Sequence, residues 1–269
     1  YSQAIKLNPK YFEAFNNAGV AYTSWKKFNK AIEYFDRAIH INPSYSEAHN
    51  NKGNALKEKG EYVLAAKAYE KSTHLKPNYI DAITNLGIVW DLMNDFIKSE
   101  KFFLQALSLD PSNISVLYNL ANCLFNKNDF KKAIEICKKI IHLEPSFYYA
   151  YNRIGLCYIK LQNEEQATIF FNKAIDINPN YAEALTNYGF LLHKLRNYSL
   201  ATLQFEKALS IDSGSSEAFV NLCKAYFDEG RLPKAIEVAN KRLSIEPKNI
   251  PLLKNLTESL LLLNRFDEA

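Results

Sequence analysis

Apolar and polar residues recur along this chain with the spacing of amphipathic helices, and short polar turns separate one helical segment from the next. In the first pair of segments, the pattern predicts a helix A over roughly Phe12 to Trp25 and a helix B over roughly Phe28 to Ile41. Proline follows nearly every predicted helix B and marks its end, because proline cannot continue a helix. The chain therefore reads as a succession of helix pairs.

The prolines also give the length of one pair. Seven of the nine share one 34-residue register, namely Pro9, Pro43, Pro77, Pro111, Pro145, Pro179 and Pro247. The register has a gap at Ser213, where Asp212, Gly214 and Ser215 favour the same turn with other residues. With the proline at position 32, full repeats begin at Phe12, Ser46, Ile80, Ile114, Tyr148, Ala182 and Ser216, and partial repeats cover 1–11 and 250–269.

Small and large residues occupy fixed columns of this repeat. Position 8 is glycine in five repeats, and position 20 is alanine in seven of eight. Position 24 holds an aromatic ring in five repeats: Phe35, Tyr69, Phe103, Phe171 and Phe205. Small residues let two helix backbones approach closely, and large ones fill the remaining space. This 34-residue pattern resembles the tetratricopeptide repeat (TPR) family over essentially the whole chain.

The TPR resemblance implies an all-α solenoid in which antiparallel helix pairs stack into a right-handed superhelix. One pair cannot bury its apolar face alone, so we expect a single array over 1–269 without an internal domain boundary. Both ends fall inside a repeat, which indicates a fragment of a longer protein. Three polar residues, each followed by an acid three positions later, are predicted to cap the next helix A: Ser44, Asn78 and Asn180.

The resemblance also implies that helix A lines the inner side of the curve, with position 6 facing a groove. Position 6 is asparagine in seven of eight units: Asn17, Asn51, Asn85, Asn119, Asn187, Asn221 and Asn255. Asparagine has only a middling helix propensity, so propensity does not explain the column. A carboxamide offers two donors and an acceptor, and we expect these residues to hold the main chain of an extended peptide.

Such an asparagine ladder is similar to the one in the superhelical repeat region of O-linked N-acetylglucosamine transferases, and related asparagines occur in peroxisomal targeting-signal receptors. The alternatives are that each carboxamide bonds within its own repeat, or that the column reflects the high frequency of asparagine in this chain. Because an exposed asparagine on a helix is not expected to add stability, alanine in this column should leave the fold intact.

Repeat 5 interrupts the column, and a cationic and aromatic zone is predicted there. Arg153 replaces the asparagine, Tyr149 replaces the acid of position 2, and Lys160 lies farther along the same helix. His193 and Lys194 follow in repeat 6. The other aromatic residues assigned to selectivity are Tyr118, Phe125, Phe190 and Phe227. This zone suits a carboxylate or phosphate beside an apolar side chain, and solvated cations are the alternative.

Position 2 is acidic in five repeats: Glu13, Glu47, Asp81, Glu183 and Glu217. A carboxylate in the first turn stabilises a helix by about 0.3–1 kcal/mol, which favours this role over an acidic groove. The carboxylate clamp of chaperone-tail receptors in this family does not fit, because Tyr149 and Thr84 stand where it needs lysine.

Composition and charge narrow the classes of partner. The chain is 48% hydrophobic and carries a net charge of +4 without a block of like charge, so it should fold throughout and nucleic acid is not an implied partner. The longest aliphatic run, Leu260 to Leu263, is far below the roughly 18 residues of a membrane-spanning helix, so no membrane insertion is expected. The four cysteines lack the spacing of disulfides or a zinc site, which favours a reducing compartment, cytoplasmic or nuclear.

No catalytic residue, metal site or cofactor is predicted. Cys123 and Cys157 share position 10 with small core residues, and His40, His74 and His142 recur at position 29, near the end of helix B. The predicted function is a scaffold that is not an enzyme and that binds a protein or extended peptide. The alternatives are the substrate-recognition region of a larger enzyme, such as a glycosyltransferase whose catalytic domain lies outside this chain, and self-association through the array.

Overall fold

The structure is a computed structural model that describes residues 2–263, except the side chains of residues 2, 4 and 6. The A helices are α2 (Phe12–Ser24), α4 (Ser46–Glu58), α6 (Ile80–Leu92), α8 (Ile114–Asn126), α10 (Tyr148–Lys160), α12 (Ala182–Lys194), α14 (Ser216–Asp228) and α16 (Ile250–Leu262). The B helices are α1 (Ser2–Leu7), α3 (Phe28–Ile41), α5 (Tyr62–Leu75), α7 (Phe96–Leu109), α9 (Phe130–Leu143), α11 (Glu164–Ile177), α13 (Tyr198–Ile211) and α15 (Leu232–Leu243). The described part of the chain contains no strand, and the predicted all-α class is confirmed.

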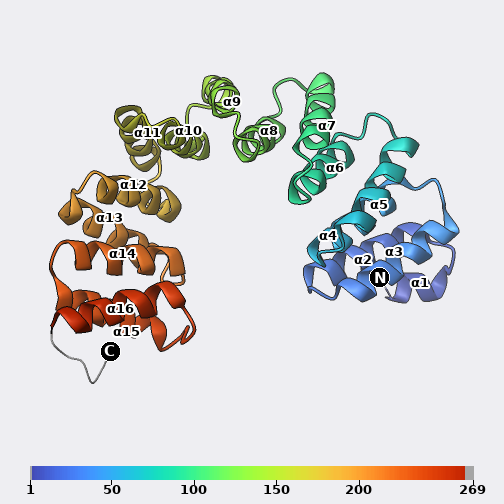
Figure 1. The fold of residues 1–269 in the computed structure, drawn as a ribbon. Helices are drawn as coiled ribbons and strands as arrows, with labels where there is room; N and C mark the ends of the chain where they lie inside the picture. Colours follow the sequence, from blue (N-terminus) through green and yellow to red (C-terminus); the bar gives the residue numbers. More distant parts are fainter. Residues whose placement is uncertain (1, 264–269) are drawn as a thin grey trace. The chain divides into compact units, whose positions relative to one another are not determined.

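Helix boundaries follow the repeat closely. Each A helix begins at the residue where a repeat was predicted to begin. The predicted start of a last helix B, at Ala269, lies outside the described residues. Two compact units can be distinguished, residues 1–136 and residues 137–269, and the division falls inside α9. Within each unit, an A helix packs on the B helix of its own repeat, and that B helix packs on the next A helix (Figure 1).

The core is built from pairs of glycine and an aromatic ring in both units. A Cβ atom on Gly53 would lie 2.5 Å from the Tyr69 ring, and one on Gly189 would lie 2.7 Å from the Phe205 ring. Repeat 7 reverses the sizes, with buried Cys223 at position 8 and buried Ala239 at position 24. Complementary volumes at positions 8 and 24 therefore set the approach of helix A to helix B.

Two kinds of turn connect the helices. Between helices A and B, the residue at position 15 has positive φ in every full repeat: Lys26, Gly60, Asn94, Asn128, Gln162, Arg196 and Gly230. Between helices B and A, an Asn or Asp side chain often accepts the backbone N–H two residues ahead, as Asn42 does from Ser44 at 3.2 Å. The turn without proline keeps this bond, since Asp212 accepts from Gly214 at 2.9 Å. It gains another, because the buried guanidinium of Arg242 donates to the Gly214 carbonyl at 2.9 Å.

The predicted capping residues are wrong. The N-caps of α4, α6 and α12 are tyrosines without a side-chain capping bond: Tyr45, Tyr79 and Tyr181. The residues Ser44, Asn78 and Asn180 lie one position upstream of these tyrosines. The backbone N–H groups of Ser44 and Asn180 bond to the turn asparagines Asn42 and Asn178, so the turn places these residues outside the helix.

Candidate functional site on the A helices

In the first unit, two hollows adjoin on the face of α2, α4, α6 and α8. One, of about 440 Å³, lies over the N-terminal halves of α4 and α6 and the start of α8, and its lining includes Asp81, Asn113 and Ser115. The other, of about 540 Å³, lies between α2 and α4, and its lining includes Val20 and Thr23. Both are lined by Asn51, Asn54 and Asn85. We call this joint surface the amide groove.

The asparagines of position 6 are linked to buried asparagines at position 5 of the preceding repeat. Asn51 Nδ2 donates to Asn16 Oδ1 at 3.0 Å, and Asn85 Nδ2 donates to Asn50 Oδ1 at 3.1 Å. Asn16 and Asn50 are only 5% and 4% exposed. The carboxamides therefore bridge successive repeats, which neither the ladder prediction nor the alternative of bonding within one repeat anticipated.

These bonds consume only part of each carboxamide. Asn85 uses one of its two amide hydrogens, and its Oδ1 and second hydrogen have no protein partner among the described residues. Asn51 has its Oδ1 3.5 Å from Asn50 Nδ2, at the outer limit of a hydrogen bond. The bond to the preceding repeat thus fixes the orientation of the Asn85 amide and leaves it a donor and an acceptor.

The second unit repeats the link within a larger network. Asn187 Nδ2 donates to Asn152 Oδ1 at 3.0 Å, and Asn152 is 1% exposed. Asn152 Nδ2 in turn donates to the Tyr181 hydroxyl at 3.2 Å and to Glu183 Oε1 at 3.1 Å. The acid of position 2 therefore serves as a hydrogen-bond acceptor here, in addition to its place in the first turn of α12.

The other members of the asparagine column differ in exposure. Asn17 is exposed, while Asn119 and Asn221 are half-buried, and Asn221 lines a further hollow with Ser216 and Asn249. Asn255 was expected on an exposed face but is buried, with 8% of its surface exposed. That residue is therefore removed from the candidate site.

Acidic partners accompany the predicted cations of the second unit. Lys194 Nζ lies 2.8 Å from Glu164 Oε1. His193 Nε2 lies 2.8 Å from Asp228 Oδ2, and Lys224 donates to the other oxygen of Asp228 at 3.1 Å. Lys160 is exposed and Arg153 is half-buried. The zone therefore holds ion pairs that involve repeats 5 to 7, and its affinity for an anion stays a prediction.

The predicted aromatic residues lie in different settings. Tyr149 is 37% exposed and stacks beside Tyr148, with ring centroids 4.2 Å apart. Phe190 is 47% exposed, and Lys224 lies 4.8 Å from the Phe227 ring. In the first unit, Phe125 contacts Phe130, and Tyr118 is half-buried. The structure brings Phe227 close to the ion pair of Lys224 with Asp228.

The four cysteines are buried thiols. Burial raises the pKa of Cys123 to about 11 and that of Cys157 and Cys223 to about 12, and it raises the pKa of Cys137 as well. Such thiols carry little thiolate near neutral pH, which fits the packing role predicted for position 10. Among the described residues, no group of three or more His, Cys, Asp or Glu could hold a metal ion.

Sequence reasoning missed the buried partners at position 5. Asn16, Asn50 and Asn152 share that column, and an asparagine there precedes the position-6 residue of the same repeat in each case. A recurring Asn–Asn or Asn–Arg dipeptide was the available signal.

No helix in residues 2–263 is long and apolar enough to cross a membrane.

Comparison with known sequence families agrees with this fold. Profiles described as tetratricopeptide repeat match residues 12–45, 114–147 and 148–181, then 34–67 and 170–202, and finally 192–260. Together they span more than half of the chain, which therefore belongs to the tetratricopeptide repeat family. The comparison with curated proteins found no match.

Solved structures of other repeat proteins share the fold. YrrB, described as a TPR protein with an unusual peptide-binding site, is 23% identical, with 68% of this chain and 95% of that chain covered and a TM-score of 0.56. PilF of Pseudomonas aeruginosa is 18% identical, with 79% and 97% covered and a TM-score of 0.65. Cut9, in the APC/C hetero-tetramer Cut9–Hcn1, is 19% identical, with 83% of this chain and 44% of that chain covered and a TM-score of 0.67. At these identities, the likeness concerns the fold alone.

Proposed function

We propose that this chain is a protein-interaction scaffold that binds an extended peptide segment of a partner. The peptide lies on the face of the A helices that carries the position-6 asparagines. Asn51 and Asn85 hold the peptide main chain in the first unit, and Asn187 does so in the second. The supporting observation is the Asn85 carboxamide, which is fixed by buried Asn50 and keeps a donor and an acceptor in the amide groove. An amide oriented before binding loses little conformational freedom when it pairs with a peptide.

Two further points support a peptide as the ligand. The lining of the amide groove mixes amides and hydroxyls with apolar Val20, Ile80 and Val116, which suits a main chain with aliphatic side chains. The description of YrrB as a TPR protein with a peptide-binding site makes this class of ligand plausible for the fold. A hydrogen bond between a carboxamide and a peptide main chain depends little on the peptide sequence. Selectivity among peptides therefore comes from side chains such as Tyr149, Phe190 and Phe227.

The test compares two double variants in binding to a displayed library of proteome-derived peptides. N51A/N85A removes the groove amides and also leaves the Asn16 and Asn50 carbonyls unpaired. N16A/N50A breaks the same two bonds but keeps Asn51 and Asn85 in the groove. We expect N51A/N85A to weaken binding roughly tenfold or more, and N16A/N50A to weaken it much less.

Circular dichroism of both variants checks that helicity is retained. Equal losses of binding in the two variants would contradict a direct contact of the Asn51 and Asn85 amides with the peptide. Binding of N51A/N85A at the wild-type level would remove the ladder from the site.

A further inference from the structure

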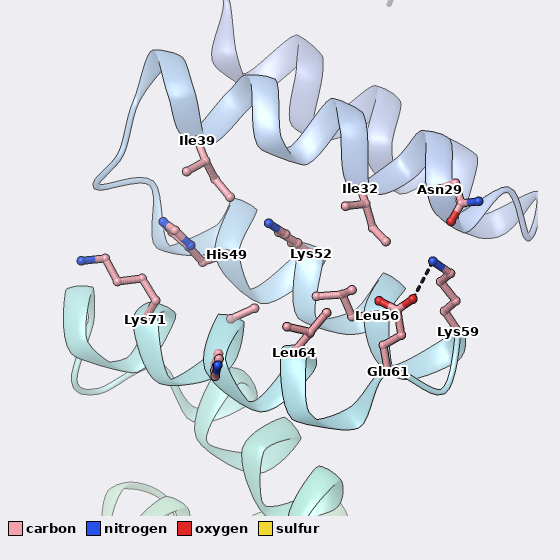
Figure 2. A pocket seen from close by; sticks show the side chains of 12 residues that line it. Asn29, Ile32, Ile39, His49, Lys52, Leu56, Lys59, Glu61, Leu64 and Lys71 are labelled. Carbon is pink, nitrogen blue, oxygen red and sulfur yellow. Dashed lines mark ion pairs between the residues drawn. The ribbon is translucent and has the colours of Figure 1, made fainter.

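A separate hollow of about 480 Å³ lies on the B-helix side of the first unit, between α3 and α5 and over α4 (Figure 2). Ile32 and Ile39 point into it from α3, and Leu56 and Leu64 lie opposite them. Leu64 is 49% exposed, so the floor is apolar surface in contact with water. The volume is within the roughly 300–1,000 Å³ typical of ligand pockets.

Lysines form the rim of this hollow. They are Lys52, Lys59, Lys67 and Lys71, and the acidic residue of the lining is Glu61. Lys59 pairs with Glu61 at 2.6 Å, and Lys52 pairs with Asp36 at 2.6 Å. Lys67 and Lys71 are exposed and have no ion-pair partner among the described residues. We call the hollow with its rim the lysine groove.

Helix stability does not explain this arrangement. Positions 22 and 26 lie one turn apart on helix B, and repeat 1 fills them with Glu33 and Arg37, which pair at 2.8 Å. Repeat 2 alone has lysine at both positions, Lys67 and Lys71. Like charges at this spacing destabilise a helix, whereas the Glu–Arg pair stabilises it. The two lysines therefore come at a cost to α5 itself.

The groove is also distinct in charge from its neighbour. His49 lines it, and burial lowers the pKa of His49, with repulsion from Lys71 and Lys52 acting in the same direction. The hollow on the other side of α3 is lined instead by Glu33, Asp36, Arg37 and His40. The excess of positive charge is therefore a local property of the space between α3 and α5.

We propose that the lysine groove is a second docking site, one that binds an acidic segment of a partner protein. Aliphatic side chains of that segment lie on Ile32, Ile39 and Leu64, and its carboxylates meet Lys67 and Lys71. Charge complementarity selects an acidic ligand, and the apolar floor selects a peptide over a nucleic acid, because the lining offers no Phe, Tyr or Trp ring for base stacking. The site goes beyond the proposed function, since it lies between α3 and α5 and shares no lining residue with the amide groove.

The test measures fluorescence anisotropy with a short labelled peptide in which Glu and Leu alternate. K67E/K71E should weaken binding roughly tenfold or more at low salt. The matched control is K101E/K207E, which reverses exposed lysines at positions 22 and 26 of other repeats and should change binding less than about twofold. A peptide with Ser in place of Leu should bind the wild-type protein more weakly, because it loses contact with the floor.

Several outcomes would overturn the proposal. Equal losses in K67E/K71E and K101E/K207E would indicate attraction to the net charge of the chain. Equal binding of the Ser peptide would show that the apolar floor is not used. If a single-stranded RNA bound more tightly than the peptide, with the same dependence on Lys67 and Lys71, a peptide would be the wrong class of ligand. N51A/N85A should leave this binding unchanged, so the two sites can be tested separately.

Discussion

The A-helix faces of the two units use the same columns for different chemistry. In the first unit, Asn51 and Asn85 are tied to buried asparagines, and the resulting amide groove is lined largely by neutral groups. In the second unit, the corresponding Asn187 link is accompanied by the ion pairs of Lys194 with Glu164 and of Lys224 with Asp228. Beneath both faces, a Cβ atom added to the glycine would lie between 2.5 and 2.7 Å from the facing aromatic ring. The comparison teaches that the repeat fixes packing while leaving the surface free to diverge.

The largest expected effect tests whether the packing beneath the two faces is equivalent. Gly87→Val and Gly189→Val each place a side chain where a Cβ alone would lie 2.7 Å from Phe103 or Phe205. We expect each to lower the free energy of unfolding by about 3 kcal/mol, the upper end for overpacking, as measured by urea denaturation. Valine at the exposed positions Lys101 and Lys207 controls for helix propensity. A large difference between the two glycine variants would break the equivalence.

A second prediction concerns the amide links that the two faces share. Asn51→Ala leaves the buried Asn16 carbonyl unpaired, and Asn187→Ala does the same to Asn152. We expect each to cost about 1–3 kcal/mol in the same denaturation experiment, and the cost should not depend on salt. This reverses the expectation that alanine in this column leaves stability unchanged.

The matched control for the amide links is the double variant N16A/N51A. It removes both halves of one bond, so it should recover part of the loss seen in Asn51→Ala. A double variant no more stable than Asn51→Ala would mean that the bond with Asn16 is not the source of the effect.

The smallest effect separates the faces by their charge. Asp228→Asn removes the carboxylate shared by His193 and Lys224 and should cost less than about 1 kcal/mol, because the groups are partly exposed. The loss should shrink as salt is raised, since salt screens surface charges. Asn54→Ala in the first unit, which removes the acceptor of the Tyr69 hydroxyl, should show no such dependence. Equal salt dependence in both variants would contradict the proposed difference between the faces.

Much of the fold could be predicted from the sequence because the same packing problem is solved in seven full repeats. The proline register of 34 residues and the small residue at position 8 allowed the first residue of each A helix to be predicted correctly. The left-handed turn at position 15 could not be predicted as readily, since glycine marks it only at Gly60 and Gly230. The capping prediction failed because the N-cap position falls one residue later, on Tyr45, Tyr79 and Tyr181.

The candidate site was only partly predictable. The column of asparagines was visible, but the direction of each amide depends on a partner 35 residues away, as Asn51 depends on Asn16. That partner column contains Asn, Thr, Tyr and Val, so it shows no uniform pattern in the sequence. The lysine groove was missed because its lysines come from α4, the turn after it and α5, and they converge only when α4 packs against α5.

The turn that replaces proline with Ser213 has a consequence for how disorder spreads along the chain. A prolyl ring restrains its turn even in the denatured protein, whereas the 212–215 turn receives part of its order from Arg242 on α15. Melting of α15 would therefore release the connection between α13 and α14, which precedes α15 in the chain. We expect fraying from the C-terminal side to cross this junction more readily than it crosses a junction closed by proline.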